Sequence, residues 1–284
     1  MGMTAGMAGR TISIGFSSCP NDTNIFYALL HKKVPFPFEI VPQITDVEDL
    51  NQMAIRRKLD VSKISYGVLD RILDDYILLK SGSAIGRGCG PIIVAKKGMD
   101  AGKLKSARIA IPGLHTTAAL LLRLYCPEAE NLVPMNFAEI ARAVAEGEVD
   151  AGAIIHETRF IYHEYGLVCL EDLGSWWEGG TGLPIPLGGI IAKRSLGHEL
   201  LQTLDNALKL SVLYGMRKKD ESLDFVRRHA QEMSLEVIDK HIKLYVNDYT
   251  ADLGEEGLKA VDFLIKMAQE KGIFRQDIAS VGKL

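Results

Sequence analysis

Strand-like and helix-like segments alternate along the first part of this chain, and that alternation limits its possible folds more than any other feature. Residues 11–17 are rich in β-branched and apolar side chains, and residues 18–33 carry apolar side chains at helical spacing. A strand-like segment at 38–44, a helical one at 46–59 and a short strand at 60–65 follow. This order favours a parallel or mixed sheet with helices on both faces.

The same order of segments begins again in the second hundred residues. Two strand–helix pairs and a final strand are expected at 106–112, 115–126, 131–136, 137–148 and 149–157. From about residue 195 onward the apolar spacing is mostly helical. The sequence therefore predicts an α/β fold with two mixed-sheet lobes.

The two halves also resemble each other weakly over residues 50–66 and 140–156. In both, an amphipathic helix ends at a charged turn, an aspartate (Asp60 or Asp150) opens a strand, and a polar residue closes it. The match is too short to establish a duplication. It indicates two lobes of similar build, each presenting strand ends to a shared cleft.

Two glycine-rich segments that become strand-like mark the junctions between the lobes. They cover 81–97 and 181–194, and their fragments IIVAKK and GIIAKR are alike. We interpret them as paired crossover strands near 91–97 and 188–194, where we expect hinge motion. The expected lobes are residues 11–95 with 195–284 for the first, and residues 96–194 for the inserted second lobe.

Composition and charge exclude several classes of protein. The 284 residues include 33 Lys+Arg and 36 Asp+Glu, a net charge of −3, so the composition shows no excess of basic residues that would indicate nucleic-acid binding, although a pocket can still be locally basic. No apolar run has the length of a membrane helix or a signal-peptide core. The cysteines, Cys19, Cys89, Cys126 and Cys169, are widely spaced. We expect a cytoplasmic protein with reduced thiols and no membrane insertion; the sequence does not indicate an oligomeric state.

In open α/β sheets, ligands bind at the carboxyl ends of strands, and the segment after the first strand is such a place. Ser18, Asn21 and Asp22 surround a proline at a helix start. These residue types cap helices, and the free N–H groups of a helix start also bind anions. Both interpretations stay open. Cys19 is a weaker candidate for a nucleophile, because no base is adjacent in the sequence.

The end of the strand at 60–65 holds a second candidate group, Lys63, Ile64 and Ser65. A lysine within a short apolar strand is unusual unless it is exposed at a sheet edge or directed at an anion. Ser65 can donate a hydrogen bond to a carboxylate, although serine is also common before turns.

The third group is the pair Thr116 and Thr117 at a predicted helix start. Two hydroxyls beside free backbone N–H groups would hold a carboxylate well. Helix capping explains one threonine of the two.

The fourth candidate, His156, follows an apolar strand and would face the cleft. Imidazole titrates near neutral pH, so His156 is the best candidate for a general base. A buried histidine satisfied by backbone groups is the alternative. Glu157 and Arg159 are near enough to tune His156 or to pair with each other. The other histidines in helical, polar surroundings are expected to be solvated: His31, His163, His198, His229 and His241.

The motifs of metal and nucleotide sites are absent from the sequence. It contains no HExxH, no paired cysteines, no aspartate-rich loop and no Walker motif, so we expect neither a metal nor a cofactor. The glycine-rich run at 86–90 lacks the helix context of a phosphate loop, and we interpret it as part of the hinge.

Five of these segments together resemble one enzyme family. They are SSCPNDTNIFYALL, DVSKISY, PGLHTTAALLL, DAGAIIHETRFIY and PLGGIIAKR, in this order within residues 11–195. The chain resembles the 1,4-dihydroxy-6-naphthoate synthases of the futalosine route to menaquinone. It departs from the common family pattern at Ser18 and at Asn24.

The resemblance implies a bilobed fold like that of type II periplasmic binding proteins. It also implies a lyase that acts on cyclic dehypoxanthinyl futalosine, removes its ribose-derived carbons and leaves 1,4-dihydroxy-6-naphthoate. The general base of the family falls on His156, and the substrate contacts fall on Lys63–Ser65 and Thr116–Thr117. The alternatives are a chorismate dehydratase of the same pathway and a non-catalytic protein that binds a small carboxylate.

Overall fold

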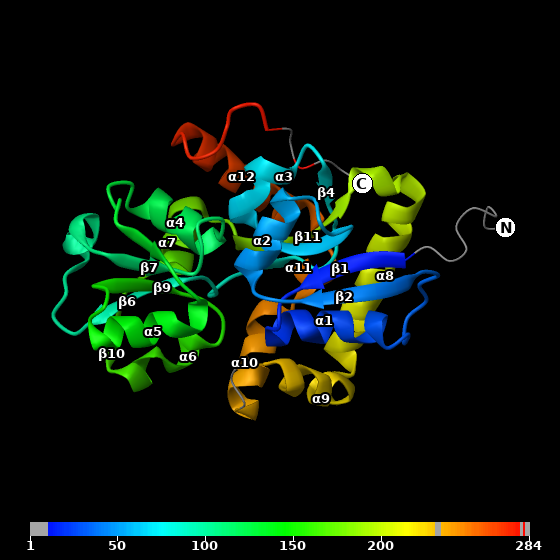
Figure 1. Cartoon of the computed structure of the whole chain (residues 1–284), viewed down its shortest axis with the longest axis horizontal. Coiled ribbons are helices and arrows are strands. Elements are labelled where there is room, and N and C mark those ends of the chain that lie inside the picture. Colours follow the sequence, from blue (N-terminus) through cyan, green and yellow to red (C-terminus); the bar gives the residue numbers. More distant parts are fainter. Residues whose placement is uncertain (1–10, 231–233, 279–280, 282–284) are drawn as a thin grey trace.

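The computed structural model describes residues 11–230, 234–278 and 281, and its strands form two mixed sheets (Figure 1). The strands of the first sheet are β1 (Thr11–Phe16), β2 (Glu39–Ile44), β3 (Val61–Ser65), β4 (Tyr76–Leu78), β5 (Ala84–Gly86) and β11 (Ile185–Lys193). Their order is β2–β1–β3–β11–β4, and β5 also pairs with β11. β1 runs parallel to β2 and β3, whereas β11 runs antiparallel to β3, β4 and β5.

The second sheet comes from the middle of the chain. Its strands are β6 (Ile92–Lys96), β7 (Ile109–Ile111), β8 (Leu132–Pro134), β9 (Ala151–Ile154) and β10 (Leu167–Asp172). Their order is β10–β6–β9–β7–β8. β7 is parallel to β8 and β9, whereas β6 is antiparallel to β9 and β10. The sequence prediction of an α/β fold with two mixed sheets is therefore confirmed.

Helices cover both sheets. Those before β11 are α1 (Pro20–Leu30), α2 (Val47–Ile55), α3 (Leu69–Ile72), α4 (Thr117–Tyr125), α5 (Phe137–Glu146), α6 (Thr158–Ile161) and α7 (Leu173–Thr181). Those after it are α8 (His198–Arg217), α9 (Lys219–His229), α10 (Leu235–Tyr245), α11 (Asp248–Ala251) and α12 (Gly254–Glu270). Short 3₁₀ turns lie at η1 (Tyr66–Val68), η2 (Ala101–Ser106), η3 (Tyr162–Tyr165) and η4 (Arg194–Leu196). None of these helices, within the ranges the structure describes, is both long enough and apolar enough to cross a membrane.

The C-terminal helices return to the first sheet. α1 packs against α8, α9 and α10, and one apolar core holds β1, α1 and α8 together. β6 pairs with strands of the second sheet, and β11 pairs with strands of the first. The boundaries of the two lobes and the hinge at these segments stay a prediction.

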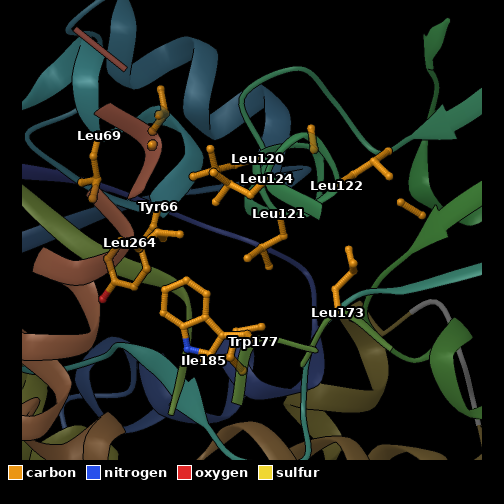
Figure 2. Close-up of a cluster of buried hydrophobic side chains, with 14 of the residues drawn as sticks. Tyr66, Leu69, Leu120, Leu121, Leu122, Leu124, Leu173, Trp177, Ile185 and Leu264 are labelled. Carbon is orange, nitrogen blue, oxygen red and sulfur yellow. The ribbon is translucent and has the colours of Figure 1, made fainter. Parts of the chain in front are cut away.

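A second apolar core joins residues of both sheets. It contains Tyr66 from η1 and Leu264 from α12, together with Leu121 from α4 and Trp177 from α7 (Figure 2). All four side chains are at most 1% exposed. Burial of apolar surface stabilises a fold by roughly 25 cal/mol per Å², so this shared core holds the two sheets against each other.

The weak internal resemblance corresponds to equivalent local structure. Asp60 accepts hydrogen bonds from the backbone N–H of Ser13 at 3.1 Å and from its hydroxyl at 2.8 Å. Asp150 accepts one from the backbone N–H of Arg108 at 2.8 Å. In each sheet, the aspartate at the start of a strand (β3 or β9) thus fastens the beginning of a parallel neighbour.

Candidate active site

A cavity of about 90 Å³ lies between the two sheets, where the carboxyl ends of β1, β3, β7 and β9 converge. Residues from both sheets line it, so neither half of the chain forms it alone. They include Ser17, Asn21, Asp22, Val47, Lys63, Ile64, Ser65, Ala84, Gly90, Pro91, Thr116, Thr117, Ala118, Ile155, His156, Leu187, Gly188 and Tyr245.

His156 stands at the end of β9 with a positive φ of 56°, a backbone conformation that is uncommon outside glycine. Its ring is partly buried and meets the Phe137 ring edge-on, with the ring centroids 4.9 Å apart. The Nε2 atom is buried and has no hydrogen-bond partner among the described residues. Burial lowers the pKa of His156 to about 4; the Asp22 carboxylate opposes this shift and the Lys63 ammonium adds to it. The imidazole is therefore uncharged at neutral pH and able to accept a proton.

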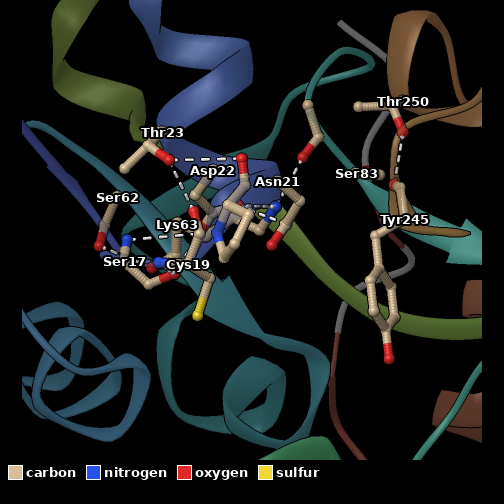
Figure 3. Close-up of polar contacts among 12 residues, drawn as sticks. Ser17, Cys19, Asn21, Asp22, Thr23, Ser62, Lys63, Ser83, Tyr245 and Thr250 are labelled. Carbon is tan, nitrogen blue, oxygen red and sulfur yellow. Dashed lines mark hydrogen bonds and ion pairs between the residues drawn. The ribbon is translucent and has the colours of Figure 1, made fainter. Parts of the chain in front are cut away.

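Lys63 and Asp22 form a buried ion pair at the cavity wall. The Lys63 Nζ lies 2.8 Å from the Asp22 Oδ1 and also donates to the Gly82 carbonyl oxygen at 3.0 Å. The Ser17 hydroxyl donates to the other Asp22 oxygen at 2.8 Å (Figure 3). Asp22 thus compensates the charge of Lys63 within the protein. The sequence predicted that Lys63 is exposed at a sheet edge or directed at an anion. In the structure Lys63 is buried, and the anion beside it is the Asp22 carboxylate of the same chain.

Asn51 connects two of the predicted substrate segments. It accepts a hydrogen bond from the Ser65 backbone N–H at 2.9 Å and donates one to the His115 carbonyl oxygen at 3.3 Å. Asn51 is fully buried. The end of β3 and the loop before α4 are therefore fixed relative to each other through Asn51. The Ile64 side chain, between Lys63 and Ser65, belongs to the shared apolar core.

The two threonines have different partners. The Thr116 hydroxyl caps α4, since it accepts from the Ala119 backbone N–H at 3.3 Å and donates to the Gly113 carbonyl oxygen at 2.8 Å. The Thr117 hydroxyl donates to the Leu187 carbonyl oxygen and accepts from the Gly67 backbone N–H. Both residues line the cavity beside the first turn of α4. Helix capping therefore accounts for Thr116, which was one of the two interpretations of the sequence. Thr117 instead bonds to Leu187 in β11 of the first sheet.

Two further polar side chains, Cys19 and Glu157, lie next to His156 behind the cavity wall. The Cys19 Sγ, a ring nitrogen of His156 and a Glu157 oxygen all lie within 4.8 Å of one another. Burial is the largest cause that raises the pKa of the Cys19 thiol, and the Glu157 and Asp22 carboxylates raise it further. Sequence spacing could not reveal this cluster, because residue 19 is far from residues 156 and 157 along the chain.

The expectation that His241 is solvated is wrong. His241 is fully buried in α10, and its Nε2 lies 2.9 Å from the Asn21 Oδ1. Its ring lies 6.1 Å from the His156 ring, nearly parallel to it. Burial lowers the pKa of His241 well below its ordinary value, and His156 contributes to this shift. The helical, polar sequence around His241 gave no sign that α10 turns this face toward α1.

The remaining histidines of that group divide in two. His31, His163 and His198 are exposed, as the sequence predicts. His229 is partly buried, because its ring packs against Phe225 with the ring centroids 4.5 Å apart.

The structure also shows where Ser18 and Arg159 lie relative to the cavity; the role of Ser18 in substrate binding stays a prediction. Ser17, and not Ser18, is among the cavity-lining residues. Arg159 pairs with the Asp172 carboxylate at 2.6 Å, and not with Glu157, and donates to the Gly90 carbonyl oxygen at 2.6 Å. Arg159 therefore fastens the glycine-rich segment before β6.

Sequence reasoning also missed three residues that line the cavity. Leu187 and Gly188 of β11 and Tyr245 of α10 line the cavity. A Cβ at Gly188 would lie 2.5 Å from the Ile64 carbonyl oxygen, so only glycine fits there without a shift. For Leu187 and Gly188 the available signal was the glycine-rich segment that precedes and enters β11, which the sequence analysis assigned to a junction; Tyr245 had no such signal.

Comparison with known proteins gives concordant matches over most of the chain. The sequence model of the menaquinone biosynthesis family matches residues 12–270. The chain is 48% identical to the 1,4-dihydroxy-6-naphthoate synthase of Thermus thermophilus, over 93% of this chain and 96% of the relative. It is 46% identical to the enzyme of the same name from Streptomyces coelicolor, over 94% and 96% of the two chains.

Solved structures agree in fold. A crystal structure of an Archaeoglobus fulgidus protein is 35% identical, with a TM-score of 0.88, and covers 93% of this chain and 98% of that one. A Candida albicans protein described as having the generic periplasmic binding protein fold is 10% identical, with a TM-score of 0.68 over 94% and 92% of the chains. The latter match concerns the fold alone, and it confirms the fold that the resemblance predicts. Because the family model spans most of the sequence and the curated relatives at 46–48% identity are synthases of one name, the chain belongs to the menaquinone biosynthesis family of enzymes.

Proposed function

We propose that this chain is a carbon–carbon lyase that converts cyclic dehypoxanthinyl futalosine to 1,4-dihydroxy-6-naphthoate in the cytoplasm. The observation that carries the proposal is that the chain is 46–48% identical, over nearly its full length, to two 1,4-dihydroxy-6-naphthoate synthases. The cavity between the two sheets, with one imidazole at its wall, supports it.

His156 acts as the general base in this proposal. Its uncharged imidazole lines the cavity, and its buried Nε2 is left without a hydrogen bond within the described residues. A bound carboxylate would bring a negative charge near the ring and make the imidazole more basic. A positioned base contributes about 10² to 10⁴ in rate.

The substrate carboxylate binds at the start of α4 in this proposal. The first turn of a helix offers free backbone N–H groups and a partial positive charge, and Thr116, Thr117 and Ala118 of that turn line the cavity. Ser65 lines the same cavity. Lys63 is already paired with Asp22, so we assign this pair, with Asn21 and Ile64, to shaping the wall rather than to neutralising the substrate.

Closure of the two lobes around the substrate would exclude water from the reaction. The lobes proposed for this motion are residues 11–95 with 195–284, and residues 96–194. A dry site strengthens each electrostatic interaction within it and protects a reactive intermediate from hydrolysis.

Mass spectrometry of products tests the proposal directly. The purified protein is incubated with cyclic dehypoxanthinyl futalosine, and we expect 1,4-dihydroxy-6-naphthoate to accumulate. Recovery of the unchanged compound would indicate a binding protein, and consumption of chorismate in a parallel reaction would indicate a dehydratase. Either result would overturn the proposal. The same assay on His156→Asn tests the proposed base, and this variant should form the product about 10² to 10⁴ times more slowly. His198→Asn, at an exposed histidine, is the matched control.

A further inference from the structure

We propose that Cys19, His156 and Glu157 form a binding site for a transition-metal ion of the Zn²⁺ class, and that occupancy of this site inhibits the enzyme. The binding claim stands on the geometry of the three side chains. The inhibition claim rests on the proposed role of His156 as the base, so the two claims are tested separately.

The three side chains supply a set of donors that suits zinc. Thiolate, imidazole and carboxylate are its usual protein ligands, with Zn–S near about 2.3 Å and Zn–N near about 2.0 Å. In a tetrahedral site these bonds place sulfur and nitrogen about 3.6 Å apart. The donor atoms of Cys19, His156 and Glu157 already lie within 4.8 Å of one another, so a contraction of about 1 Å completes the site.

A second observation comes from the two neighbouring imidazoles. The His156 Nε2 and the His241 Nδ1 are buried and make no hydrogen bond among the described residues. His241 is fully buried, and its Nδ1 lies 3.8 Å from the Glu157 Oε2. Buried nitrogens without hydrogen bonds are costly. Coordination through Nε2 would satisfy this atom of His156, and a fourth position can be taken by His241 or by water.

The charge balance also suits a divalent cation. Binding proceeds as Cys19–SH + M²⁺ → Cys19–S–M⁺ + H⁺, and the proton leaves to solvent without any change of oxidation state. The thiolate and the Glu157 carboxylate together compensate the two positive charges of the ion. Lys63, the nearby cation, is held by Asp22 at 2.8 Å and adds little net repulsion.

The position of His156 links the metal site to the cavity. His156 lines the cavity, whereas Cys19 and Glu157 are buried behind it. A metal bound to the ring takes the lone pair that would accept a proton from the substrate. Occupancy therefore blocks the base and leaves most of the substrate contacts in place.

Cobalt titration tests the binding claim without substrate. Co²⁺ is added to the purified, reduced protein, and we expect a thiolate-to-cobalt charge-transfer band with the visible bands of tetrahedral cobalt. Cys19→Ala should abolish the charge-transfer band, and Cys169→Ala, at an exposed cysteine, should keep it. No band, or a band that depends on Cys169, would overturn the proposal and indicate adventitious binding.

A second variant keeps the test decisive if Cys19→Ala does not fold. Glu157→Gln retains the thiol and the imidazole but removes the charged oxygen ligand. It should weaken Zn²⁺ binding, measured by calorimetry, by at least about 10-fold, because loss of a hydrogen-bond partner of a ligand already costs about 10- to 100-fold and Glu157 is a ligand itself. Unchanged affinity would contradict the site.

The inhibition claim has its own readout. Zn²⁺ should reduce turnover of the wild-type enzyme, and EDTA should restore it. If Zn²⁺ binds through Cys19 and turnover persists, the inhibition claim and the assignment of His156 as the base fail together, while the metal site stands. If no turnover is seen even without metal, the proposed function fails and the cobalt result is unaffected.

Discussion

The Lys63 ammonium of β3 lies 2.8 Å from the Asp22 carboxylate of α1, and both side chains are almost completely buried. Asp22 also accepts hydrogen bonds from Ser17 and from the Asn21 amide, each at 2.8 Å. A buried charge is tolerated when it is paired and hydrogen-bonded, as this one is. The pair fixes the first turn of α1 against the end of β3, at the wall of the cavity.

Removing one member of this pair should destabilise the protein more than removing both. We expect Asp22→Asn or Lys63→Met alone to cost about 3–5 kcal/mol in the free energy of unfolding, because each leaves a buried charge without its partner. The double variant should lose less than the sum of the two. Urea unfolding of the four proteins measures this coupling. Additive losses would show that the two charges do not interact.

The pH dependence of kcat/KM should report the ionisation of His156. Burial lowers its pKa to about 4, so the uncharged base persists well below neutral pH and is lost as the pH falls through about 4. We therefore expect the acid limb of kcat/KM near pH 4, measured over the range in which circular dichroism shows a folded protein. His156→Asn should lower kcat by about 10² to 10⁴. An acid limb near 6.5 would contradict a buried base.

The same pKa shift makes stability depend on pH. His156 binds its proton near pH 6.5 when unfolded and near pH 4 when folded, so the unfolded chain holds more protons between these values. The free energy of unfolding should therefore fall as the pH falls from about 6.5 toward 4, by at most about 1.4 kcal/mol per pH unit for this group. His156→Asn should flatten that slope in urea unfolding measured at several pH values. An equal slope in the variant would assign the dependence to other groups.

Thr116 is expected to act on both stability and substrate binding. Its hydroxyl caps α4, and Thr116→Ala should cost about 1 kcal/mol in the free energy of unfolding. Asn136→Ala removes the corresponding cap of α5, which is not part of the cavity, and should cost a similar amount. We expect KM to rise in Thr116→Ala alone. If both variants keep the wild-type KM, the start of α4 does not bind the substrate.

Gly188 should not tolerate a side chain. A Cβ there would lie 2.5 Å from the Ile64 carbonyl oxygen, so Gly188→Ala must displace β11 or β3 at the cavity wall. We expect a lower melting temperature and a lower kcat/KM. Gly179→Ala is the matched control, because a Cβ at that exposed helical position meets nothing within 4 Å. It should be neutral or stabilising by about 0.4–1 kcal/mol. Equal behaviour of the two variants would contradict the close approach.

The sequence by itself determined the elements and the type of fold. Apolar spacing located β1, α1, α2 and β3 to within a few residues. Buried side chains recur every second residue along a strand and about every 3.6 residues along a helix, so the spacing of apolar residues distinguishes the two. The internal resemblance located Asp60 and Asp150 at equivalent strand starts. The order of five short segments indicated the family, which the comparisons confirm.

Only the tertiary structure decided which polar groups meet. His241 looked solvated because its own helix is polar, yet α10 buries it against Asn21. The sequence predicted that Lys63 is exposed at a sheet edge or directed at an anion, and only the fold showed that α1 places Asp22 beside it. Cys19 gained His156 and Glu157 as neighbours from the other half of the chain. Local sequence fixes the periodicity of each element. Charge compensation and pKa shifts depend on distances between elements, and only the packing of helices and sheets in the folded chain sets those distances.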